Sequence, residues 1–93
     1  MKHILDKLTS YTLALRDALD RTNEANERPQ ITKHLAAAAE IFALLNMHQT
    51  TEAIDHIIKK ENRSHSLSYL SGKEGQNVEK KWLAFVEATG IEL

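Results

Sequence analysis

Histidine and carboxylate side chains are the groups of this sequence best suited to metal chemistry, and the chain has five histidines. Glu52 and His56 stand one helical turn apart, so both could reach one ion, with Asp55 beside them. A metal site needs three or four converging ligands, and this segment alone does not supply them. His48, near the end of a predicted helix, is explained by the favourable interaction of a cation with the helix dipole. The sequence therefore predicts no metal site and no cofactor.

Nucleophilic catalysis would require a serine or cysteine that is activated by a histidine and oriented by a carboxylate. Four serines between residues 64 and 71 lie near His65, but no Gly-x-Ser-x-Gly elbow is present. The chain has no cysteine, and residues 72–75 lack the pattern of a phosphate-binding loop. We therefore predict that the protein is not an enzyme.

The composition favours one globular domain that spans residues 1–93, with 42% apolar and 27% charged residues. Two separate cores would leave roughly 45 residues each, near the lower limit for independent folding. No apolar run is long enough to span a membrane, and the first seven residues lack the apolar stretch of a secretory signal. We expect a cytoplasmic protein. Its net charge of −1 creates no field that would attract nucleic acid or anionic lipid in bulk, although residues 56–82 have a modest basic excess.

Apolar residues recur at steps of three and four along most of the chain, which is the period of an amphipathic helix. The pattern predicts helices over about residues 2–24, 29–47, 51–62 and 74–89. Pro29 fits the first turn of the second helix, where its missing N–H is tolerated. Gly90 stands where a helix end favours positive φ, and the apolar Ile91 follows it. Because no strand-like alternation is present, we predict an all-α fold, either a four-helix bundle or an orthogonal helical packing.

The second predicted helix is apolar around much of its circumference, because a run of four alanines lies among larger apolar residues. Only three other helices are available to cover it, so part of this surface is expected to stay exposed. Ala36, Ala39 and Ala43 are therefore predicted to contact another protein, most simply a second copy of this chain. We predict a regulatory protein-interaction module that self-associates and acts by binding a larger protein, for example as an inhibitor.

Trp82 has two interpretations, because it lies at core spacing on the last predicted helix but follows two lysines. In the first interpretation it fills the bundle core. In the second it is an interface anchor, with Lys80 and Lys81 forming a basic rim that selects an acidic partner.

The segment from 42 to 58 resembles helix-turn-helix DNA-binding proteins, with Asn46 at the turn position usually given to glycine. The resemblance implies that Gln49, Thr50 and Thr51 face bases in the major groove. Glu52 falls where that family buries a valine or isoleucine, and acids on the recognition helix would be repelled by phosphates. DNA binding is therefore the alternative function, and nucleic acid is not the favoured partner.

A second resemblance is to histidine phosphotransfer domains, which are four-helix bundles of similar size. His56 with Lys59 three residues later is similar to their phosphorylated histidine and following lysine. The glycine that comes next in that family is Lys60 here. This resemblance implies a remote alternative in which His56 carries a phosphoryl group.

Overall fold

The computed structural model describes residues 2–48, 51–64 and 72–93, and these form four α-helices without any strand. The helices are α1 (Lys2–Arg21), α2 (Glu27–Asn46), α3 (Thr51–Ser64) and α4 (Gly72–Thr89). The all-α prediction is confirmed, and each described boundary lies within three residues of the predicted one. None of the helices described is long and apolar enough to cross a membrane.

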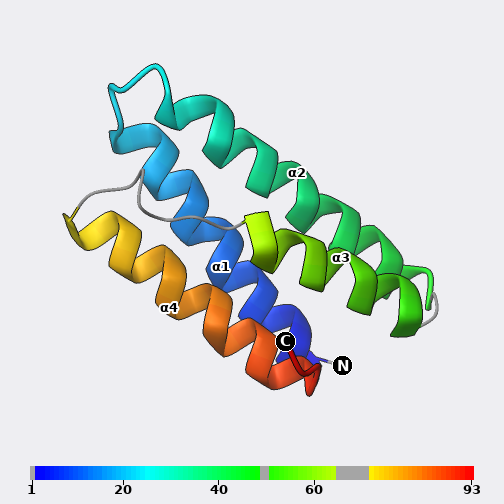
Figure 1. Ribbon diagram of the computed structural model, residues 1–93. Helices are drawn as coiled ribbons and strands as arrows, with labels where there is room; N and C mark the ends of the chain where they lie inside the picture. The colour runs from blue at the N-terminus through cyan, green and yellow to red at the C-terminus, as the bar shows by residue number, and fades with distance from the viewer. Residues whose placement is uncertain (1, 49–50, 65–71) are drawn as a thin grey trace.

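Helix α1 packs along both α2 and α4, while α3 packs on α2 (Figure 1). The chain ends lie close together at one end of the bundle, where α1 begins and α4 finishes. Helix α3 runs back alongside α2 in the opposite direction. This arrangement leaves the side of α2 that faces away from α1 and α3 uncovered by any described helix.

The core consists of the apolar faces of all four helices. In α1 the predicted positions at steps of three and four, from Leu8 to Ala18, are buried. The largest buried side chains are Tyr11 of α1 and Trp82 and Phe85 of α4. The Tyr11 and Trp82 ring centroids are 5.0 Å apart, and those of Trp82 and Phe85 are 5.7 Å apart. These tilted aromatic contacts are favourable beyond the area that they bury.

Helix α2 begins at Glu27, two residues before the predicted start at Pro29. The Thr22 hydroxyl hydrogen-bonds the Glu27 carboxylate, and the Glu27 N–H donates to the Glu24 carbonyl at 3.1 Å. These contacts form a tight turn after α1 that starts α2 earlier. Pro29 still lies in the first turn of α2, where an N–H would have no partner within the helix.

The end of α4 follows the prediction for Gly90, whose φ of +75° lies in the left-handed region. The Gly90 N–H donates to the Glu87 carbonyl at 3.1 Å, which is one of the two bonds of a Schellman motif. The other bond would join the Ile91 N–H to the Val86 carbonyl, and the Thr89 hydroxyl bridges these two groups instead. It donates to the Val86 carbonyl at 2.6 Å and accepts from the Ile91 N–H at 3.2 Å.

Candidate interaction site

The uncovered side of α2 carries a row of small side chains that we call the α2 outer face. Its residues alternate at steps of three and four, and all of them are exposed: Pro29, Thr32, Ala36, Ala39, Ala43 and Asn46. The opposite side of α2 fills the core with Ile31, His34, Ala38, Ile41 and Leu45. The spacing of the outer face is that of the contact positions in a two-stranded coiled coil. The three alanines predicted to form an interface are therefore exposed together on one face.

A groove of about 470 Å³ lies beside the α2 outer face, between α2 and α3. Three of its lining residues are apolar, Ala36, Ala37 and Ile57, and the others are polar or charged: Lys33, Glu40, His56, Lys60 and Glu61. The two alanines are small, which leaves room beside them for a side chain from another molecule. The groove therefore extends the exposed surface of α2 toward α3.

Charges are distributed unevenly along this groove. His34 of α2 contacts Glu61 of α3, and the two helices run in opposite directions. Lys33 and Lys60 therefore share one end of the groove, whereas Glu40 and His56 lie toward the other end. Glu61 adjoins Lys60 at the first end, so that end carries charges of both signs, and the groove as a whole has no simple polarity.

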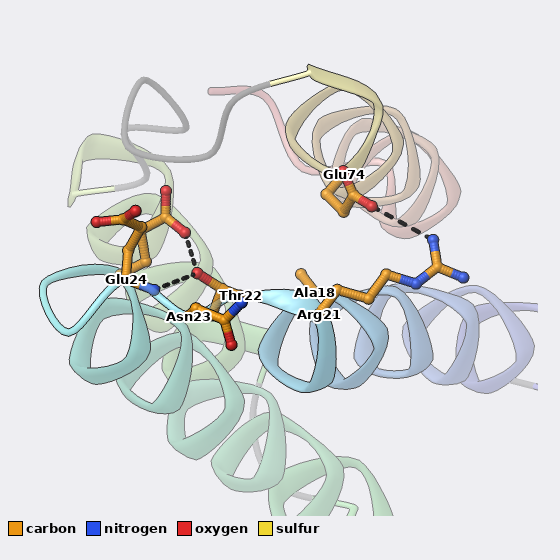
Figure 2. A pocket seen from close by; sticks show the side chains of 7 residues that line it. Ala18, Arg21, Thr22, Asn23, Glu24 and Glu74 are labelled. Atoms are coloured by element: carbon orange, nitrogen blue, oxygen red, sulfur yellow. Dashed lines mark hydrogen bonds and ion pairs between the residues drawn. The ribbon is translucent and has the colours of Figure 1, made fainter.

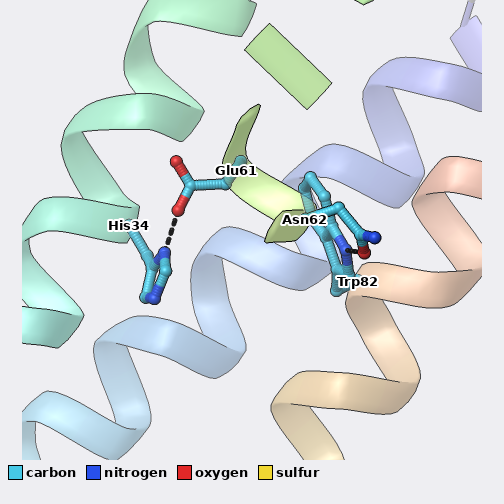
Figure 3. A network of polar contacts seen from close by, with 4 residues as sticks. All are labelled: His34, Glu61, Asn62 and Trp82. Atoms are coloured by element: carbon cyan, nitrogen blue, oxygen red, sulfur yellow. Dashed lines mark hydrogen bonds and ion pairs between the residues drawn. The ribbon is translucent and has the colours of Figure 1, made fainter. Parts of the chain in front are cut away.

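A buried polar pair connects α2 and α3 beneath the groove. The His34 imidazole is 1% exposed, and its Nδ1 contacts a carboxylate oxygen of Glu61, a residue that is 8% exposed. Figure 3 shows that the neighbouring Asn62 points the other way, toward α4. There the Trp82 indole N–H donates to the Asn62 side-chain oxygen at 3.0 Å. The last turns of α3 are thus held to two other helices by directional bonds.

The apolar spacing of the sequence does not identify His34 or Glu61 as site residues, although both occupy core positions on their helices. His34 lies three residues after Ile31, and Glu61 lies three residues after Ile58, at the spacing of a buried stripe. A polar residue at such a position signals a buried hydrogen bond. The spacing alone does not identify the partner.

The structure distinguishes between the two interpretations of Trp82. Its side chain is 1% exposed and packs among Tyr11 and Phe85, so it belongs to the core. The prediction of Trp82 as an exposed interface anchor is wrong for this reason. Lys80 is exposed and Lys81 is half-buried, but they do not surround an exposed aromatic side chain.

The residues that carry the two family resemblances are only partly described. Gln49 and Thr50 lie outside the described residues, and Thr51 is exposed as the first residue of α3. Glu52 is exposed, so no carboxylate is buried at that position. Helix α3 runs back along α2 (Figure 1), whereas the two helices of a helix-turn-helix cross steeply. His56 is exposed at the groove, and the Lys59 ammonium forms an ion pair with Asp55 at 3.3 Å.

A polar cluster joins the end of α1 to the beginnings of α2 and α4 (Figure 2). The Arg21 guanidinium lies 3.3 Å from a Glu74 carboxylate oxygen, and the Thr22 hydroxyl accepts from the Glu24 N–H at 3.2 Å. Glu74 is in the first turn of α4, where its backbone hydrogen bond and then the Arg21 side chain lower its pKa. The cluster therefore connects three helix ends through hydrogen bonds and one ion pair between its own residues.

We predict that the pKa of Glu74 lies below the ordinary glutamate value of about 4.3, and that Arg21→Gln raises it only partly. The larger cause, the backbone hydrogen bond, remains in that variant. Because the folded-state pKa is lowered, the stabilisation is present above the unfolded-state pKa and is lost as pH falls through the folded-state value. NMR titration of the Glu74 carboxyl carbon measures both effects. A return to the ordinary value in Arg21→Gln would show that the ion pair is the main cause.

Comparison with known proteins found no match: no family model, curated protein or solved structure is significantly similar to the chain. Among the residues that the structure describes, no three His, Asp or Glu side chains converge to hold a metal ion.

Proposed function

We propose that this protein is a non-catalytic helical interaction module that self-associates through the α2 outer face. The observation that carries the proposal is an exposed row of small side chains at coiled-coil spacing, flanked by charges of opposite sign one heptad apart. Alanine at the contact positions allows two helices to approach closely, because little side chain separates their backbones.

An antiparallel pair matches small residues with one another. With the two-fold axis between residues 37 and 38, Ala36 lies opposite Ala39 of the second copy, and Thr32 lies opposite Ala43. Such an interface uses the same patch on both copies, as two-fold symmetry requires. One helix pair buries a small area, at the low end of protein interfaces, so we expect a dissociation constant of about 10–100 µM.

The flanking charges favour the antiparallel orientation over the parallel one. Lys33 and Glu40 are both exposed and lie on the same side of the row of small residues. In the antiparallel pair each Lys33 lies near Glu40 of the second copy, so two attractive pairs form. In a parallel two-fold pair, Lys33 and Glu40 of one copy lie on the opposite side of the interface from those of the second copy, so these attractive pairs do not form. Exposed ion pairs contribute only about 0.2–1 kcal/mol each, so these charges select orientation while apolar burial supplies affinity.

Sedimentation equilibrium at low salt, from micromolar to several hundred micromolar protein, tests this arrangement through charge reversal. We expect Glu40→Lys to weaken association about tenfold, because two attractive pairs become repulsive. Lys33→Glu should weaken it similarly, and the double variant Lys33→Glu/Glu40→Lys should restore it. Salt should reduce all these differences by screening.

Glu79→Lys on the exposed surface of α4 is the matched control, and it should leave the association constant unchanged. A monomer throughout the concentration range would contradict self-association. A double variant no tighter than the single variants would contradict the antiparallel arrangement.

A further inference from the structure

A second, separate hollow is lined by residues near the start of α1 and the end of α4. Figure 1 shows that these two helix ends lie at the same end of the bundle. The hollow has a volume of about 170 Å³, and all four helices contribute to its lining. The lining is mainly apolar: Ile4, Leu45, Ile54, Phe85 and Ile91. We call this hollow the end cavity. It is distinct from the α2 outer face, which lies along the side of the molecule.

The polar residues of the end cavity are His48, Thr51 and Thr89. The Thr89 hydroxyl already donates to the Val86 carbonyl and accepts from the Ile91 N–H, so its one proton is used. His48 and Thr51 are exposed and therefore belong to the mouth of the cavity. A water molecule needs two to four polar partners to be held in a protein interior. The apolar lining of the inner part does not supply them.

We propose that the end cavity binds the aliphatic part of a small amphipathic molecule, with the polar end directed outward to His48 and Thr51. An apolar protein cavity of roughly 150 Å³ is known to accept a benzene-sized molecule. The end cavity is slightly larger, so a chain of about six carbon atoms fits its size. A polar group at one end of that chain would meet an imidazole and a hydroxyl at the mouth.

Hexan-1-ol is the probe, and it is titrated into the intact protein while the methyl NMR signals of the isoleucine residues are followed. We expect saturable shifts of Ile54 and Ile91, with a dissociation constant of the order of 1 mM from burial of the alkyl chain. Hexane-1,6-diol has the same length but would bury a hydroxyl group without partners. It should bind at least tenfold more weakly.

Two variants locate the binding site. Ile91→Phe places a larger side chain at the edge of the cavity, outside any helix, and is expected to abolish the saturable shift of Ile54. His48→Gly removes the imidazole and suits the backbone, because His48 has a φ of +53°. It should fold normally and weaken hexanol binding several-fold. Leu83→Ala, at an exposed leucine on α4, is the control that should bind like the original protein.

Three results would overturn the proposal. One is the absence of saturable shifts up to 20-fold above the expected dissociation constant (about 20 mM) in a protein that gives the spectrum of a folded chain. Another is equal binding of the diol, which would indicate a polar site. The third is unchanged binding in Ile91→Phe, which would place the hexanol elsewhere. Because self-association uses a different face, Glu40→Lys should leave hexanol binding intact, so failure of one proposal is distinguishable from failure of the other.

Discussion

Replacing Glu61 with leucine is expected to lower the free energy of unfolding by about 3 kcal/mol, because it removes the carboxylate that contacts the buried His34 imidazole. His34 is 1% exposed and is enclosed by the helices around it. Its Nδ1 would lose this partner without gaining access to water. When one member of a buried polar pair is removed, the free energy of unfolding falls by most of the desolvation penalty of the group that stays buried.

Removing the other member of the pair, with His34→Leu, is expected to lower the free energy of unfolding by less, about 1–2 kcal/mol. Glu61 lines the α2–α3 groove, so its carboxylate can turn toward solvent when the imidazole is absent. The double variant His34→Leu/Glu61→Leu replaces both groups with apolar side chains and should be close to the original stability. The two effects are therefore expected to be strongly non-additive, as for residues in direct contact.

Urea unfolding followed by circular dichroism measures these differences, provided that the denaturant dependence is the same in every variant. Glu61→Gln is the conservative control. It keeps the side-chain volume and an oxygen acceptor, so its loss should be about 1 kcal/mol. Additive effects in the double variant, or a loss below about 0.5 kcal/mol in Glu61→Leu, would show that the pair does not hold α3 to α2.

The positions of the helices could be predicted from sequence because the signals are local. The apolar period, Pro29 and Gly90 each act within a few residues, and α4 ends as Gly90 indicates. The small errors at the ends of α1 and α2 arise from the turn around Thr22 and Glu27. There, side-chain and backbone bonds extend α2 beyond its apolar pattern.

The site could be predicted only in part, because its geometry depends on how the helices pack. An excess of apolar surface on α2 was evident from the alanine run, and Ala36, Ala39 and Ala43 are exposed. Which side of α2 stays uncovered depends on where α1 and α3 lie. The contact between His34 and Glu61 likewise requires α3 to run back along α2, and no local pattern specifies that course.

Trp82→Ala is expected to have the largest effect of any single substitution in the core, a loss of about 3–5 kcal/mol in the free energy of unfolding. Trp82 packs against Tyr11 of α1 and Phe85 of α4, and its indole N–H binds Asn62 of α3. One side chain thus connects three helices. Small domains have a total stability of only about 5–15 kcal/mol, so this variant should be partly unfolded at moderate temperature.

Separate substitutions distinguish the packing contribution of Trp82 from its hydrogen bond. Asn62→Ala removes the indole acceptor and leaves the ring in place, so its cost should be about 1 kcal/mol. Leu83→Ala, at the exposed neighbour, should stay within about 0.5 kcal/mol of the original protein. Circular dichroism is the appropriate probe, because Trp82 is the only tryptophan and its fluorescence is lost in Trp82→Ala. A cost of Trp82→Ala no greater than that of Asn62→Ala would contradict the conclusion that the ring fills the core.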